Sequence, residues 1–91
     1  MHPAPCLLSL LLLAACMENA ATPDADLRMR QQSACASAIA DHIRRPVAVV
    51  SPRWLSETNG VATVETMDGT RRHLCTVDAS GRVTGYSHPR N

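Results

Sequence analysis

The hydrophobic pattern of this chain changes its period at Pro46, and this change limits the fold more than any other feature. Before Pro46, one stripe of mainly apolar side chains recurs at about every fourth position, the spacing of a helix face. The stripe consists of Leu27, Gln31, Cys35, Ile39 and Ile43. After Pro46 the pattern alternates with a period of two, which is typical of β-strands. The order predicts an α+β domain, with one N-terminal helix packed on a three- or four-stranded antiparallel sheet.

The ends of the helix are marked by local signals. Thr22-Pro23-Asp24 provides a capping hydroxyl, a proline for the first helical position and an acid for the first turn. Arg44 and Arg45 suit the negative end of the helix dipole, and Pro46 ends the helix. We therefore expect a helix from about Asp24 to Arg44.

The second half of the chain predicts a series of short strands. Val47 to Val50 is a β-branched run, which Ser51 to Trp54 would bend or end. Val61 to Met67 and Thr70 to Val77 flank an Asp-Gly pair, a strong hairpin signal. After a turn at Asp78 to Gly81, Arg82 to Tyr86 forms a last strand.

The hairpin register follows if Asp68 and Gly69 are the two loop residues. Met67 then faces Thr70, and Glu65 faces Arg72 in an exposed ion pair worth a few tenths of a kcal/mol. The better core face contains Ala62, Val64, Cys75 and Val77. The other face carries Val61, Leu74 and the ion pair.

The N-terminal segment predicts export and lipidation. Leu7 to Leu13 has the length of a signal-peptide hydrophobic region and is too short to span a bilayer. Leu13-Ala14-Ala15-Cys16 resembles the lipobox of bacterial lipoproteins, in which the cysteine receives diacylglycerol and further acyl chains such as palmitate. The resemblance implies a signal peptide at residues 1–15 and stable anchoring through Cys16.

The same resemblance implies where the protein is located. A lipidated Cys16 places the chain in the cell envelope, facing the periplasm, and Met17 in place of Asp favours the outer over the inner membrane. Residues 16–24 would form the lipidated N-terminus and a flexible tether. Because MHPAP contains no Lys or Arg, an ordinary secretory leader and a true start at Met17 remain alternatives.

The two cysteines that follow Cys16 predict a disulfide. Trp54 and Tyr86 are the only aromatic residues apart from histidine, so the chain can form only a small core. Cys35 lies on the helix stripe and Cys75 on the predicted core face, so their sulfurs should meet in an oxidising compartment. Closing a loop of some 40 residues adds about 4 kcal/mol in the chain-entropy model.

The rival interpretation of these cysteines is a metal site. Cys35, His42, His73 and Cys75 would form a Cys₂His₂ set. Cys35 and His42 are seven positions apart on the predicted helix, which places their Cα atoms about 10 Å apart along the axis. We therefore expect a disulfide, with no metal and no cofactor.

The sequence favours a binding protein over an enzyme. The net charge of +1 gives no reason to expect nucleic acid as a partner, and no catalytic motif or defensible catalytic pair is present. Arg53 and Trp54 are candidate partner-binding residues, since both types are favoured at interface hot spots. We expect a membrane-anchored, non-catalytic binding or envelope-accessory module. Alternatives are an inhibitor of an envelope hydrolase (a lysozyme or protease), inserting a loop at Ser51 to Asn59, or a structural lipoprotein without a specific partner.

A second resemblance covers about sixty residues. ACASAIA, VAVVS and HLCTVDASGRVTGY are similar to a set of small, uncharacterised exported proteobacterial proteins. These share a cysteine-bearing, alanine-rich helix and a closing C-x-V-x-x-x-G-x-V motif. We expect the folded domain at residues 25–87 and a loose tail at residues 88–91.

Overall fold

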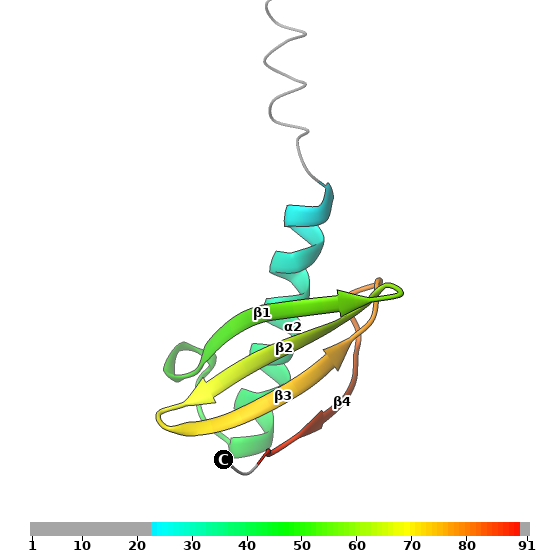
Figure 1. Cartoon of the computed structure of the whole chain (residues 1–91). Coiled ribbons are helices and arrows are strands. Elements are labelled where there is room, and N and C mark those ends of the chain that lie inside the picture. Colours follow the sequence, from blue (N-terminus) through cyan, green and yellow to red (C-terminus); the bar gives the residue numbers. More distant parts are fainter. Residues whose placement is uncertain (1–22, 90–91) are drawn as a thin grey trace, which may run out of the picture.

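The computed structural model describes residues 23–89 of the chain. The signal peptide predicted at residues 1–15, the lipidation site Cys16 and the tether before Pro23 lie outside the described residues. The elements, in chain order, are helix α2 (Pro23–Ile43), the 3₁₀-helix η1 (Val47–Val49) and strands β1 (Ser51–Thr58), β2 (Val61–Asp68), β3 (Arg71–Val77) and β4 (Val83–Ser87) (Figure 1).

The fold is the predicted α+β arrangement. The strands form one antiparallel sheet in the order β1-β2-β3-β4, so each strand pairs with its neighbour in the sequence. Helix α2 crosses one face of this sheet (Figure 1). Within residues 23–89, no helix combines the length and the apolar character that crossing a membrane requires.

The core lies between α2 and the middle of the sheet. Cys35 and Cys75 form a disulfide there, with their Cα atoms 5.8 Å apart, and both residues are fully buried. The predicted disulfide is thus confirmed. The rest of this core consists of Ile39, Ala62, Val64 and Val77. The separation of the two Cα atoms lies within the usual range of about 4.4–6.8 Å for a disulfide.

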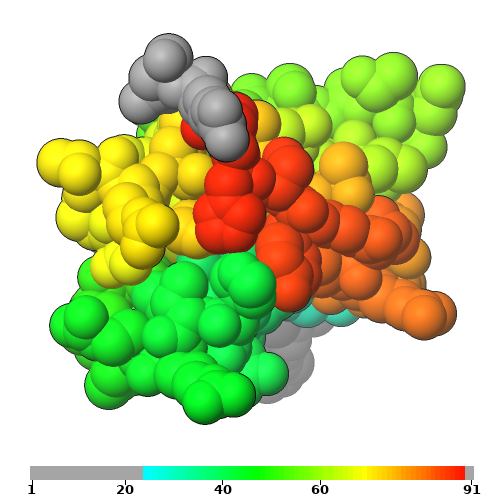
Figure 2. Space-filling model, turned by 90° about the horizontal axis from the view of Figure 1, so that it is seen from below, coloured from blue at the N-terminus to red at the C-terminus, as the bar shows by residue number. Residues whose placement is uncertain are grey.

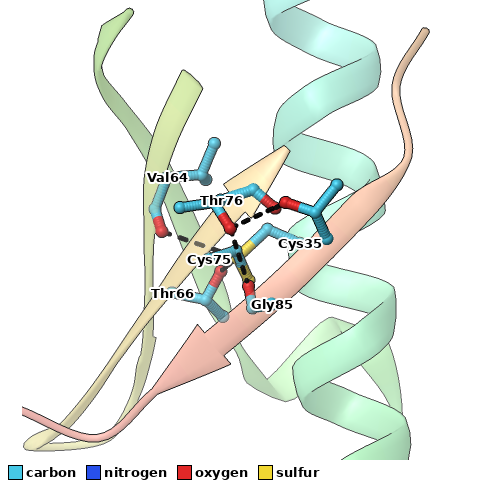
Figure 3. The surroundings of a disulfide bond; sticks show 7 residues. Cys35, Val64, Thr66, Cys75, Thr76 and Gly85 are labelled. Atoms are coloured by element: carbon cyan, nitrogen blue, oxygen red, sulfur yellow. Dashed lines mark hydrogen bonds between the residues drawn. A yellow bond between two sulfur atoms is a disulfide. The ribbon is translucent and has the colours of Figure 1, made fainter. Parts of the chain in front are cut away.

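Figure 3 shows the surroundings of the disulfide, which include the hydroxyl group of Thr66 and the backbone of Val64. The buried Thr66 hydroxyl donates to the Cys35 Sγ atom at 3.0 Å. The same sulfur lies 3.6 Å from the carbonyl oxygen of Val64, but a disulfide sulfur has no proton to donate. The Thr66 hydroxyl therefore has only a weak acceptor in the core.

The predicted register of the central hairpin was wrong by one loop residue. Asp68 pairs with Arg71 and Met67 with Arg72, so the loop residues are Gly69 and Thr70. Gly69 has φ 60°, as the first loop position of a type II′ turn requires. Moving the loop by one residue shifts each pairing by two, which leaves the faces unchanged. The predicted core face is therefore confirmed.

The segment after Pro46 also differs from the prediction. Val47–Val49 form a 3₁₀ turn, with the Val50 N–H donating to the Val47 carbonyl oxygen at 3.2 Å. The first strand is Ser51–Thr58, where we expected a bend and a loop. Pro52 is compatible with this strand because it lies near the start of a strand at the sheet edge. The segment Ser51 to Asn59 is therefore not an inserting loop.

Candidate functional site

Trp54 lies on β1, half-buried, with its ring packed toward α2. Its indole N–H donates to the Gln31 Oε1 atom at 2.9 Å. Its main-chain N–H donates to the Gln32 Oε1 atom at 3.1 Å. Two consecutive glutamines of the helix thus hold the position of the ring before any partner arrives.

Gln31 is the polar member of the helix stripe, and it is 1% exposed. Its Nε2 group donates to the carbonyl oxygen of Asp78 at 3.0 Å and lies 3.4 Å from that of Val77. The amide therefore connects α2 with both β1 and the end of β3. A buried amide needs such partners, so a glutamine within an apolar stripe is the sequence signal for this junction.

Arg28 covers the outer side of the same ring. Its guanidinium carbon lies 4.1 Å from the centre of the Trp54 ring, within the range of a cation–π interaction. Arg28 is exposed, so the interaction is worth about 0.5–1 kcal/mol. Sequence reasoning did not find Arg28, because its distance of 26 positions from Trp54 carries no local signal.

A hollow of about 190 Å³ opens beside the ring. It is lined by Asp24, Leu27, Arg28, Gln31, Trp54, Glu57 and Gly60. Small-molecule pockets usually measure about 300–1,000 Å³, so this hollow suits a single side chain better than a whole ligand. Its rim carries charges of both signs beside an aromatic wall.

The β1–β2 turn closes one side of this hollow, called the Trp54 hollow below. Asn59 has φ 52° and Gly60 has φ 82°, the positive values that a type I′ turn requires at both loop positions. The Glu57 Oε2 atom accepts a hydrogen bond from the Gly60 N–H at 2.6 Å. This bond places the Glu57 carboxylate at the rim of the hollow.

Arg53 does not accompany Trp54. Neighbouring residues of a strand point to opposite faces, so Arg53 lies on the face of the sheet away from α2. There it forms an ion pair with Glu65 at 3.4 Å, and Arg72 contacts the same carboxylate at 2.7 Å. The predicted Glu65–Arg72 pair is therefore present, but the prediction that it is exposed was wrong, since Glu65 is 9% exposed.

The four residues of the rival metal set do not form one site. Cys35 and Cys75 are bonded to each other and are not available as thiolate ligands. His42 is exposed, whereas His73 is buried, and burial together with the neighbouring His88 and His42 lowers the pKa of His73. Among residues 23–89, no three His, Cys, Asp or Glu side chains are arranged as a metal centre without some movement.

The fold and this site define a small disulfide-linked α+β domain with an aromatic hollow between its helix and an edge strand. Comparison with known proteins found no match to any family model, curated protein or solved structure.

Proposed function

We propose that the protein is a lipid-anchored, non-catalytic binding module of the cell envelope that recognises a protein partner through the Trp54 hollow. It would be attached through Cys16 to the outer membrane and face the periplasm. The observation that carries the binding proposal is the preorganised ring of Trp54, held by Gln31 and covered by Arg28. Trp and Arg are the residue types that most often dominate the free energy of protein association.

The geometry supports a partner that inserts one side chain. Trp54 is already fixed by two hydrogen bonds, so binding would require little further ordering of the ring. Arg28 and Glu57 lie at the rim of the hollow and offer charges of opposite sign to polar groups around an inserted apolar side chain. Such rim charges contribute to specificity and association rate more than to affinity.

The position of the hollow supports a partner close to the membrane. Asp24, which lines the hollow, follows Cys16 by eight residues. Eight residues span at most about 28 Å when fully extended. With Cys16 acylated, the hollow would therefore stay within about 28 Å of the anchor. A partner of this site must reach the same layer of the envelope.

The anchor is tested by the intact mass of the full chain expressed in a Gram-negative cell. We expect a chain that begins at Cys16, carries added acyl mass and has no thiol open to alkylation. Cys16→Ser is the matched control, and it should lose the acyl mass and leave the membrane fraction. An unprocessed chain with reactive thiols would contradict both the anchor and the exported location.

The binding surface is tested by photo-crosslinking in living cells, with the crosslinking amino acid at Glu57. Arg30 is the matched control position, because it is exposed on α2 but does not line the hollow. We expect a discrete adduct from position 57 that is absent from position 30 and is weakened by Arg28→Ala. Identical adducts from both positions, or none from position 57, would favour a structural lipoprotein without a specific partner.

A further inference from the structure

Three histidines from distant parts of the chain meet near the C-terminal end of α2. His42 lies in the last turn of α2, His73 on β3, and His88 directly after β4. Figure 2 shows this end of the molecule, where segments coloured green, yellow and red come together. The Trp54 hollow includes Asp24 in the first turn of α2, so the histidines form a separate site.

Two of these side chains already have the spacing of metal ligands. The Nε2 atoms of His42 and His88 lie 3.2 Å apart. Two nitrogens that bind one tetrahedral ion at about 2.0–2.1 Å lie about 3.3 Å from each other. The ring centres of His42 and His88 are 5.3 Å apart, close to the value of about 5 Å that such a pair requires.

Tyr86 orients the first of the two rings. Its hydroxyl oxygen lies 3.3 Å from the Nδ1 atom of His42. If the Nδ1–H group of His42 donates a hydrogen bond to this oxygen, Nε2 carries no proton. The lone pair of Nε2, the atom that faces His88, is then free to bind a metal ion. Metal-binding histidines commonly use their second nitrogen in this way, in a hydrogen bond that fixes the tautomer.

His73 supplies the independent observation that points to a ligand. It is 1% exposed, and neither of its ring nitrogens has a hydrogen-bond partner. A buried polar group without a partner is unfavourable, and such groups in folded proteins usually have a functional reason. Its ring centre lies 4.2 Å from that of His88 and 6.3 Å from that of His42. The ring therefore needs to shift by only about 1 Å to stand equally far from both, near the 5 Å spacing of three ligands on one ion.

We propose that His42, His73 and His88 bind one divalent transition-metal ion, with Zn²⁺ or Cu²⁺ as the ligand class. Three neutral imidazoles suit these ions. Both cysteines of the domain are in the disulfide, so the ligands would be the imidazoles and not thiolates. His42 and His88 are exposed, which gives the ion a path to the site. A fourth ligand would come from solvent. The bound ion would fasten the segment after β4 to the end of α2.

The test is titration of the full, disulfide-bonded chain with Zn²⁺ or Cu²⁺ alone. Calorimetry measures the affinity and the number of ions bound, and the melting temperature is measured with and without the ion. We expect one ion per chain and a higher melting temperature, since the ion binds the folded state. His42→Gln and His88→Gln should each weaken binding at least tenfold. Both residues are exposed, so these variants should fold. Ser87→Ala is the matched control, and it should bind like the parent chain.

His73 and Tyr86 separate this site from weaker alternatives. His73→Asn should also weaken binding at least tenfold, and Tyr86→Phe should weaken it by about tenfold as a second-sphere partner does. Binding that survives His73→Asn in a folded variant would overturn the three-histidine site. Binding that is not saturable, or that is unchanged by His42→Gln and His88→Gln, would show adventitious ions only and would also overturn it.

Discussion

The buried Gln31 side chain accepts the indole N–H of Trp54 at 2.9 Å and thereby joins the helix to the edge strand β1. The amide nitrogen of the same residue donates to the carbonyl oxygen of Asp78 at 3.0 Å. One side chain therefore connects three segments that are far apart in the sequence. This junction supports the wall of the Trp54 hollow and stabilises the domain at the same time.

Gln31→Met tests the junction, because methionine keeps most of the volume and removes both hydrogen bonds. We expect the free energy of unfolding to fall by about 1–3 kcal/mol, the usual effect of leaving buried polar partners unpaired. Urea unfolding measures the change, and Ser33→Ala on the exposed side of α2 is the control. Unchanged stability in Gln31→Met would mean that water replaces the amide without loss.

The disulfide should provide a large share of the stability of this small core. The bond joins residues 40 positions apart, and closing such a loop is worth about 4 kcal/mol in the chain-entropy model. We expect the paired variant Cys35→Ala/Cys75→Ala to lose about that much, measured by urea unfolding. Thr66→Val is the control, because it removes the hydrogen bond to the Cys35 Sγ atom and keeps the disulfide. It should change the free energy of unfolding little, because sulfur is a weak acceptor. A paired variant as stable as the parent would contradict this view.

The sequence was sufficient to predict the helix, the last three strands, the core face and the disulfide. Periodicity alone placed Cys35 and Cys75 on the two surfaces that pack together. The face assignment survived the error at the central hairpin, because the loop moved by one residue and each pairing by two. Gly69 has the positive φ at the first loop position, whereas the prediction had placed glycine second.

The first strand could not be predicted from local propensity. The β-branched run Val47–Val49 forms a 3₁₀ turn, and the less regular segment SPRWLSET forms β1. Pairing with β2 decides this outcome, and a bulge at Leu55 interrupts the alternation that a sequence reading relies on. The Asn59-Gly60 pair was the available signal, since it is a strong two-residue hairpin turn.

The candidate site was predicted only in part. Trp54 was identified as a candidate binding residue, and the structure places it beside the hollow. Its neighbour in space is Arg28 on the helix, whereas the predicted companion Arg53 lies on the other face of the sheet. Contacts between a helix and a strand depend on the angle at which they cross, which periodicity does not specify.

The two arginines around Glu65 should contribute unequally. Arg72 contacts the carboxylate at 2.7 Å with its side chain 34% exposed, whereas Arg53 contacts it at 3.4 Å with its side chain 70% exposed. We expect Arg72→Ala to lower the free energy of unfolding by about 1–2 kcal/mol and Arg53→Ala by less than about 0.5 kcal/mol. Chemical denaturation in a double-mutant cycle with Glu65→Ala measures each coupling. Equal coupling energies would show that burial does not control the strength of these pairs.

Asp78 should make the stability of the domain sensitive to acid. Its Oδ1 atom accepts hydrogen bonds from the Ser80 hydroxyl at 2.6 Å and from the main-chain N–H groups of Ser80 and Arg82, each at 3.0 Å. The bond from the Ser80 hydroxyl is the main cause that lowers the pKa of Asp78 below its ordinary value of 3.8, and the bond from Arg82 adds to it. Hydrogen bonds to the charged form of a carboxyl group act in this direction.

The sign of the effect follows from the lowered pKa of Asp78 in the folded state. Near its ordinary pKa of 3.8, the unfolded chain binds more protons than the folded one, so stability rises with pH. The contribution of Asp78 to stability is complete above pH 3.8 and is lost as the pH falls through the lower pKa of the folded state.

Ser80→Ala should raise the pKa of Asp78 in the folded state toward 3.8, which an NMR titration of the Asp78 carboxyl carbon measures directly. Asp78→Asn should reduce the loss of stability between about pH 7 and pH 3, whereas Asp41→Asn, at an exposed position of α2, is the matched control. If Asp78→Asn and the parent chain lose the same stability over this range, the turn at Asp78 does not contribute to the acid sensitivity.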